Sequence, residues 1–324
     1  MNSPTHHMAE RMIELACRAP SVHNTQPWRW RIRGDGSIEL WADRERQLGV
    51  ADPDGRNLAI SCGAALHHLV VSGRALGGTP VVELMPVRGE ADLLAYIRIG
   101  PGLPETDASK TLDAIARRCT DRRRFTSWPV PDSRLAHLAQ AAAGWGGYAI
   151  PILDASARFR CELLLSRAQT TQQSDARFSK EQQVWTDHST VDGIPTPNTA
   201  PSSGASSNQR PNRFAPKYLN PDSGAVVESS DGLMVICTAL DDQRAWLGSG
   251  QVLSALWLRA TRGGLSLVPL SQVVEVPETR NALHHDILAG LAHPQILMRI
   301  GWQEIGRSAL SLTPRRPVRD VLLP

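Results

Sequence analysis

The sequence predicts a fold of the α+β class, built from two similar units in one chain. Segments with the period of an amphipathic helix are interleaved with short strands. The helix through Gly63-Ala64-Ala65-Leu66 has a counterpart through Gly250-Gln251-Val252-Leu253, and each ends at a Gly-Gly pair before a strand. The triplet Arg-Ile-Gly ends a later strand in both halves, at Arg98 and Arg299. Two anchors in the same order indicate a duplicated unit of roughly 100 residues. Chance similarity between two amphipathic helices is the alternative.

The composition is that of an ordinary globular protein. The 324 residues are 41% hydrophobic and 21% charged, with a formal net charge of +3, too small to indicate a nucleic acid or an anionic membrane as partner. The five cysteines form no C-x-x-C pair, which argues against a zinc ribbon, a thioredoxin-type centre or a disulfide framework. The sequence shows neither a signal peptide nor a membrane span. We therefore expect a cytoplasmic protein.

The first unit is expected to cover residues 1–104 and to end at the Pro101–Pro104 boundary. Its helices should lie where apolar residues share one face, and its strands where apolar and polar residues alternate or where turns bound an apolar run. The expected helices are 5–18 and 55–76, and the expected strands are 28–33, 38–41, 81–85 and 93–99.

The second unit is expected to cover residues 105–324. Its expected helices are 108–118, 132–143, 156–171, 242–262 and 278–289, and its expected strands are 148–153, 233–240, 265–270 and 295–302. Between them, residues 172–223 are dominated by Pro, Ser, Asn, Thr and Gly. This segment is too long for an ordinary loop and indicates a lid, an insertion or a partly disordered arm.

A basic segment follows the first helix of the second unit. Residues 117–124 hold five arginines beside Thr120. Their mutual repulsion has to be offset by an anion or by carboxylates, and a phosphate would suit the bidentate guanidinium donors. A solvated basic turn paired with Asp or Glu is an equally good interpretation of the charge alone. The pair Arg315 and Arg316 could reach the same anion.

The loop of residues 19–28 is rich in short hydrogen-bonding side chains and precedes an aromatic-rich strand. Ser, Asn and Gln are what a planar heterocycle with alternating donors and acceptors needs. On composition alone, a turn whose polar side chains bond to their own backbone is the better interpretation.

Several motifs together resemble the FMN-dependent nitroreductase family. Residues 19–28 resemble its Pro-Ser-Asn loop, residues 118–122 its Arg-x-Ser-x-Arg/Lys phosphate motif, and 265–275, 294–301 and 314–317 its C-terminal half. The order is unusual, because here the Arg motif follows the Pro-Ser-Asn loop instead of preceding it. This order is similar to that of the Acg-type flavoproteins of actinobacteria. It implies two fused nitroreductase-like subdomains that form an intrachain pseudo-dimer.

The resemblance implies one FMN per chain, since each unit has lost a different part of the site. The first unit keeps the Pro-Ser-Asn loop, whereas its counterpart near 144–147 has degenerated. The resemblance places the FMN phosphate and ribose on side chains of the second unit: Arg118, Thr120, Arg315 and Arg316. It places Arg122 near the pyrimidine edge of the flavin, where a cation raises the reduction potential.

The flavin ring would be contacted by both units. From the first unit, the family's loop implies contacts from Pro20, Ser21, Val22 and Asn24. From the second unit, the turn formed by Pro269, Leu270, Ser271 and Gln272 would line the other edge and offer a backbone N–H to N5. In this family no side chain is an obligatory acid or base, so no catalytic side chain is expected.

The sequence and the resemblance are therefore compatible with two functions. The first is an oxidoreductase that uses NAD(P)H to reduce nitroaromatics or quinones. The second is an FMN storage or sequestration protein, in which 172–223 closes a lid over the flavin with little or no reductase activity. In the second case Phe178, Trp185 and residues 192–195 would pack over the ring, with an exposed disordered linker as the alternative. The chain is expected to be a pseudo-dimeric monomer or a weak homo-oligomer.

No metal is expected. The paired histidines are adjacent in sequence, so they point apart on a helix and cannot share an ion. No Walker loop or G-x-G-x-x-G is present, and NAD(P)H would have to dock over the flavin.

Overall fold

The computed structural model describes residues 4–198, 230–304 and 312–324, and within them the chain forms two antiparallel sheets of four strands each. The first sheet has the order β1-β2-β4-β3 and the second has the equivalent order β5-β6-β8-β7. The strands of the first sheet are β1 (Trp28–Ile32), β2 (Ile38–Ala42), β3 (Gly78–Leu84) and β4 (Leu93–Pro101). Those of the second are β5 (Tyr148–Pro151), β6 (Gly232–Thr238), β7 (Leu265–Pro269) and β8 (His293–Trp302). The α+β class is thus confirmed.

Helices cover both sheets. Those of the first unit are α1 (Pro4–Ala16) and α2 (Arg56–Ala75), and α3 (Ala108–Arg117) begins the second. The remainder are α4 (Asp132–Ala141), α5 (Ala155–Ser174), α6 (Ala176–Val184), α7 (Gln243–Arg262), α8 (Gln272–Glu275), α9 (Pro277–Ala282) and α10 (Val318–Val321). No helix in the described ranges is long and apolar enough to cross a membrane.

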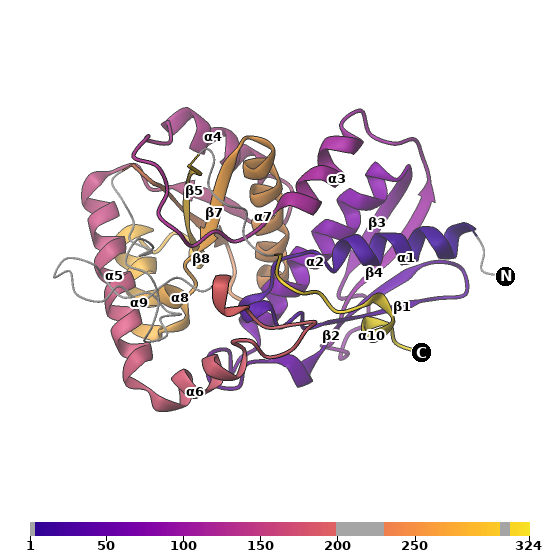
Figure 1. The fold of residues 1–324 in the computed structure, drawn as a ribbon, viewed down its shortest axis with the longest axis horizontal. Coiled ribbons are helices and arrows are strands. Elements are labelled where there is room, and N and C mark those ends of the chain that lie inside the picture. Colours follow the sequence, from indigo (N-terminus) through magenta and orange to yellow (C-terminus); the bar gives the residue numbers. More distant parts are fainter. Residues whose placement is uncertain (1–3, 199–229, 305–311) are drawn as a thin grey trace.

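Helices α2 and α7 cross at the centre of the molecule, with one sheet on either side (Figure 1). A Cβ added at Gly63 would collide with the Leu247 carbonyl oxygen, and a Cβ added at Gly250 would collide with the Ile60 carbonyl oxygen. Gly63 and Gly250 hold equivalent positions in two helices of 20 residues each. Such reciprocal contacts are those of a two-fold interface, so the halves meet as a pseudo-dimer within one chain.

Burial on all sides explains the sequence of α2. Nearly all of its residues are buried, because it packs against the first sheet on one side and α7 on the other. A helix in that position is apolar around most of its circumference instead of along one stripe. Glycine at the crossing point allows the two backbones to approach closely, which is why a residue of low helix propensity stands in the middle of each helix.

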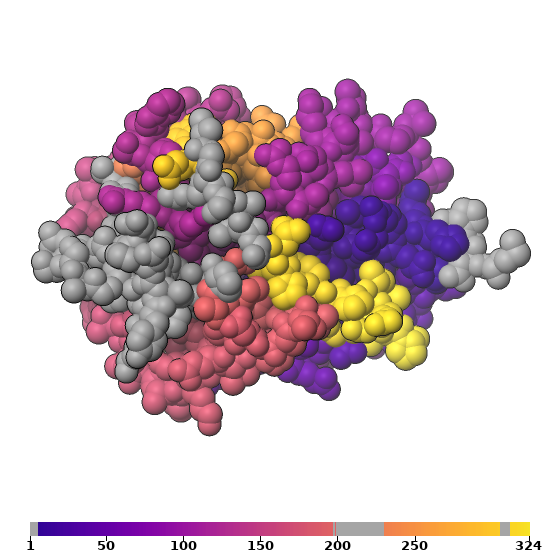
Figure 2. Space-filling model, viewed as in Figure 1, coloured from indigo at the N-terminus to yellow at the C-terminus, as the bar shows by residue number. Residues whose placement is uncertain are grey.

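The C-terminal segment returns to the first sheet. Leu323 N donates to the Trp30 carbonyl oxygen of β1 at 2.6 Å, and Leu322 forms an isolated bridge with Trp30. The segment from Leu312 to the C-terminus therefore lies between α1 and the residues around 190, as the yellow segment of Figure 2 shows.

The early part of the 172–223 segment is more regular than its composition predicts. Helix α5 continues to Ser174, and α6 follows directly. The Asp175 carboxylate caps α6 by accepting from Arg177 N at 2.9 Å, and Phe178 is buried. A side-chain cap and one buried aromatic residue are enough to start a short helix in a polar segment. Residues 199–223 lie outside the described residues.

Candidate functional site

The loop before β1 has a strained backbone. His23, Asn24 and Gln26 all have positive φ values, between 47° and 56°. Each such residue costs free energy of order 1–3 kcal/mol and persists only where its surroundings fix it, often at functional sites. The Ser21 hydroxyl accepts from Gln26 N at 3.0 Å, and the Ser61 hydroxyl of α2 accepts from Val22 N at 3.1 Å. The loop is thus anchored on α2, with residues 20–23 facing a cavity.

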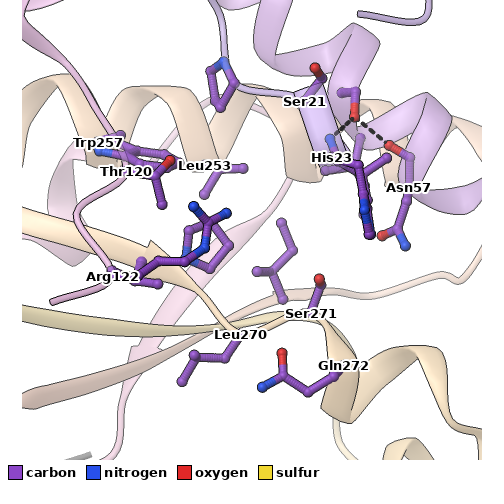
Figure 3. Close-up of a pocket in the computed structure, with 17 residues that line it drawn as sticks. Ser21, His23, Asn57, Thr120, Arg122, Leu253, Trp257, Leu270, Ser271 and Gln272 are labelled. Atoms are coloured by element: carbon purple, nitrogen blue, oxygen red, sulfur yellow. Dashed lines mark hydrogen bonds between the residues drawn. The ribbon is translucent and has the colours of Figure 1, made fainter. Parts of the chain in front are cut away.

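This cavity, the ring cavity, lies between the two units (Figure 3). In Figure 3, Thr120 and Arg122 lie on one side of it, His23 and Asn57 lie on the other, and Ser271 and Gln272 close the lower edge. It holds about 860 Å³ of space, counting the part open to solvent. Its lining residues are Pro20, Ser21, Val22, His23, Asn57, Ile60, Ser61, Thr120, Arg122, Leu253, Trp257, Val268, Pro269, Leu270, Ser271, Gln272 and Ile296.

A second cavity, the cationic cavity, adjoins the first at Thr120, which lines both. Its charged walls come from the segment after α3 and from the C-terminal segment. The residues that define it here are Arg18, Arg118, Cys119, Thr120, Arg315 and Arg316. Asn198, near the end of the described part of the insertion, also lines it. The structure therefore brings the predicted residues, Asn24 excepted, to two adjoining cavities.

Buried guanidiniums dominate the cationic cavity. Burial lowers the pKa of Arg118 to about 10, and burial together with the Arg118 charge lowers the pKa of Arg315 to about 9. The Nε atoms of both side chains are buried and have no hydrogen-bond partner in the described part of the chain. Arg118 also stacks over the Trp257 ring at 4.7 Å. The wall of the cavity thus holds two buried guanidiniums with unused Nε donors, and Glu14 is the one carboxylate among its described lining residues. An anion would relieve the repulsion between the two guanidiniums.

The neighbouring arginines are mostly paired with carboxylates. Arg117 pairs with Asp113, and Arg123 pairs with Asp121 at 2.8 Å. Arg316 lines the cationic cavity, but its guanidinium donates to Asp43 at 3.3 Å and to the backbone carbonyls of Gln26 and Asp320. The expectation of a basic turn paired with acids is therefore right for Arg117 and Arg123, whereas Arg118 lines the cationic cavity.

Asn24 is the predicted ring-contacting residue that lies outside the ring cavity. Its Nδ2 donates to the carbonyls of Gly193 and Pro314 at 2.9 and 3.0 Å, and its Oδ1 accepts from Arg315 Nη1 at 2.9 Å. The amide is therefore fully used in joining the loop to the insertion and to the C-terminal segment. The resemblance to the family's loop implied a ligand contact for Asn24, and only the tertiary structure shows its partners.

The described end of the insertion, residues 185–198, crosses the loop and is called the strap here. Gln26 Nε2 donates to the Val191 carbonyl at 2.9 Å, and Arg46 forms a short ion pair with Asp192. Phe178, Trp185 and residues 192–195 do not line the ring cavity. Trp185 stacks instead on His188, at 4.6 Å between centroids, and lies against Arg46. Packing over the ring is therefore not seen among the described residues of this segment.

Several lining residues have no sequence signal as site residues. Asn57, Leu253 and Trp257 lie on α2 and α7, where the pattern indicates core. Asn57 Nδ2 donates to Glu275 Oε1 at 3.0 Å, and Gln172 Nε2 donates to Glu275 Oε2 at 2.8 Å. The Glu275 carboxylate thus holds the Asn57 side chain in the wall of the ring cavity. His23 also lines the cavity, and its position within the loop of residues 19–28 is the sequence signal for it.

Comparison with known proteins identifies the family. No family model matches the sequence. The chain is 36% identical over 315 residues to "Putative NAD(P)H nitroreductase Rv3131" of Mycobacterium tuberculosis, covering 96% of this chain and 90% of that protein. It is 31% identical over 319 residues to "Putative NAD(P)H nitroreductase acg" of the same organism, covering 95% and 93%.

Solved structures show a partial likeness. A nitroreductase with bound FMN from Bacteroides fragilis has a TM-score of 0.42 and 15% identity, over 63% of this chain and 94% of that one. One from Desulfitobacterium hafniense, also with bound FMN, has a TM-score of 0.40 and 12% identity, over 65% and 95%. On the evidence of the two mycobacterial relatives, which match it over almost its whole length, this chain belongs to the NAD(P)H nitroreductase family.

Proposed function

We propose that the chain binds one FMN between its two units and is an NAD(P)H-dependent oxidoreductase that reduces nitroaromatics or quinones. The observation that carries this proposal is the junction of a cationic cavity with a mixed polar and apolar cavity at Thr120. A flavin mononucleotide has the same two-part chemistry, an anionic phosphate joined to a planar heterocycle. When bound, the flavin supplies hydride and electron transfer.

The cationic cavity suits the phosphate. Arg118 and Arg315 are buried enough to have lowered pKa values, and both keep an unused Nε donor. Thr120 stands at the entrance to the ring cavity and would supply a further donor. Arg316 would act mainly by holding the C-terminal segment in place, because Asp43 and Gln26 already bind its guanidinium and its backbone N–H. A phosphate dianion would offset the repulsion between Arg118 and Arg315.

The ring cavity suits the heterocycle. Ile60, Leu253 and Trp257 supply apolar walls, while the polar side chains of Ser271 and Gln272 lie at its edge. Arg122 points into the space from the side of the second unit. A fixed positive charge there would favour the reduced flavin and raise its reduction potential.

One site per chain is the expected stoichiometry. The loop that contributes Pro20 to His23 belongs to the first half, and the segment that contributes Arg118 to Arg122 belongs to the second. We infer that the halves descend from one duplicated unit and that each has kept a different part of the site. The proposed boundary between them, near residue 104, falls between β4 and α3.

Removing the phosphate contacts tests the proposal. Each charge-assisted contact is worth about 1.5–3 kcal/mol, so Arg118→Ala with Arg315→Ala should weaken FMN binding by a factor of about 10² to 10⁴. The matched control is Arg117→Ala, whose guanidinium is exposed and paired with Asp113. Dialysis followed by flavin absorbance measures the retained cofactor. Full retention in the double variant would show that the phosphate lies elsewhere.

Storage or sequestration of FMN is the second candidate function, and the strap favours it. Contacts of Asn24, Gln26 and Arg46 with residues 191–193 tie the strap across the loop that lines the ring cavity. Anaerobic addition of excess NADH or NADPH distinguishes the two functions. Bleaching of the flavin absorbance supports the reductase. If the colour persists but dithionite removes it, the storage function gains, and Asp192→Ala, which frees Arg46, should then increase reduction by NAD(P)H.

A further inference from the structure

The pseudo-two-fold relation between α2 and α7 places another cavity opposite the ring cavity. When α2 and α7 are aligned so that Gly63 matches Gly250, Val70 of α2 matches Trp257 of α7. In the same alignment Gly248 of α7 matches Ser61 of α2. The loop before β5 stands where the Pro-Ser-Asn loop stands before β1. This second cavity is lined by Val70, Arg74, Pro80, Val82, Leu84, Gly144, Trp145, Gly146, Thr238, Ala239, Leu240, Asp242, Arg244, Ala245, Gly248 and Gln251.

The second cavity differs from the ring cavity in how its loop meets the central helix. In the ring cavity the Ser61 hydroxyl holds the loop at Val22. Here the loop lies directly on α7, because a Cβ added at Gly248 would stand only 2.7 Å from the Gly146 carbonyl oxygen. The Trp145 indole occupies part of the space and meets His67 edge-on, with 4.3 Å between ring centroids. What remains is a groove with an aromatic wall, of about 1200 Å³ against about 860 Å³ for the ring cavity, both counting the part open to solvent.

Two guanidiniums stand at this pocket without carboxylate partners. Arg74 Cζ lies 5.7 Å from the Trp145 ring centroid, and across the described ranges its guanidinium has no hydrogen bond or ion pair. Arg244 donates one long bond to the Leu84 carbonyl, at 3.4 Å. The carboxylate of Asp242 caps α7 by accepting from Ala245 N at 2.8 Å. The lining therefore carries two cations against one capping carboxylate.

Apolar side chains also line this cavity. Val70 and Pro80 are buried, and Val82 and Leu84 of β3 are half-buried and line the same cavity as Trp145. An apolar slot with an aromatic wall and two guanidiniums matches a planar ring that bears a carboxylate: the ring packs on the indole and the aliphatic side chains, and the carboxylate accepts from the arginines.

We propose that this second cavity is a binding site for a planar aromatic carboxylate, separate from the ring cavity. The inference rests on residues that take no part in the proposed FMN site, so either can fail without the other. Arg74 and Arg244 are both exposed, and their removal should leave the fold intact.

Fluorine NMR titration with 4-(trifluoromethyl)benzoate tests the site. Arg74→Ala with Arg244→Ala should weaken binding at least tenfold. The matched control is Arg134→Ala with Arg259→Ala, which removes two guanidiniums from a different groove, between α4 and α7, and should leave the affinity unchanged. The neutral 4-(trifluoromethyl)benzamide should bind wild-type protein at least tenfold more weakly than the benzoate.

Occupation of the ring cavity by the same probe has to be distinguished. Arg122→Ala alters the ring cavity and should leave the benzoate affinity unchanged. If Arg122→Ala abolishes binding while the Arg74/Arg244 double variant retains it, the probe occupies the ring cavity and the proposal is wrong. The absence of any binding to wild-type protein at millimolar concentration overturns it as well. FMN content is measured on the same samples, so a failure of the flavin proposal is seen separately.

Discussion

Replacing Gly250 by alanine tests the contact that joins the two halves. The added Cβ would collide with the Ile60 carbonyl oxygen and would also come within 2.7 Å of Ala64 N, both atoms of the α2 backbone. A backbone cannot turn aside as a flexible side chain can, so α2 and α7 would have to move apart. Both helices are buried along nearly their whole length, and any separation opens the packing on both sides.

The sign of the effect is diagnostic. In an ordinary helix interior, Gly→Ala stabilises by roughly 0.5–1 kcal/mol. Overpacking a close contact costs about 1–3 kcal/mol, and overlap with a backbone atom belongs at the upper end of that range. Gly250→Ala should therefore lower the free energy of unfolding, net, by about 2–2.5 kcal/mol. Thermal unfolding followed by circular dichroism should show a drop in Tm, at about 2–4 °C per kcal/mol. Gly63→Ala should behave in the same way, because its Cβ would collide with the equivalent Leu247 carbonyl.

Gly34→Ala is the control, since a Cβ at that position meets nothing within 4 Å. Its Tm should stay close to that of the wild type. A Gly250→Ala protein that is as stable as the wild type, or more stable, would refute the close crossing of α2 and α7 and with it the pseudo-dimer described above.

Two further predictions concern buried polar groups. Ser254→Ala should lower the free energy of unfolding by about 1–3 kcal/mol. The hydroxyl meets His67 Nδ1 at 2.7 Å and His68 Nδ1 at 2.8 Å, and its loss would leave the buried His67 Nδ1 unpaired, whereas His68 Nδ1 keeps its bond to the Ala64 carbonyl. Chemical denaturation measures the change, and an unchanged midpoint would contradict it. Burial raises the pKa of Asp52 from its ordinary 3.8 to about 6. The folded state therefore binds the extra proton, and the contribution of Asp52 to stability falls as pH rises from about 4 to about 6, by up to about 1.4 kcal/mol per pKa unit. The stability advantage of wild type over Asp52→Asn should shrink across that window, and a constant difference would show that Asp52 does not titrate there.

Much of the fold follows from periodicity. Helices α2 and α7 and the strands that follow them begin and end within a few residues of their expected bounds, since long apolar segments with glycine ends leave little ambiguity. The equivalent strand order of the two sheets gives the predicted repeat a structural counterpart. Helix α6 was missed because its sequence is polar and its start depends on one Asp175 cap.

The candidate site was predictable where short motifs carry it. The loop of residues 19–28 and the arginine segment of residues 117–124 were expected to meet, and Thr120, Arg122 and residues 20–22 do line one cavity. The partners of individual side chains were not predictable. Asn24 binds Gly193 and Pro314, and Arg316 binds Asp43, through contacts between segments far apart in the chain. The sequence pattern predicts Trp257 only as a core residue. In the structure it is buried and also forms part of the wall of the ring cavity.

Flavin stoichiometry tests the central claim most directly. The protein is saturated with FMN, freed of excess by gel filtration, and analysed for flavin absorbance against polypeptide concentration from amino-acid analysis. The proposed site predicts one FMN per chain, reduced well below one in the Arg118→Ala, Arg315→Ala variant. Two per chain would mean that the second cavity also takes flavin, and none would mean that the two cavities joined at Thr120 serve another ligand.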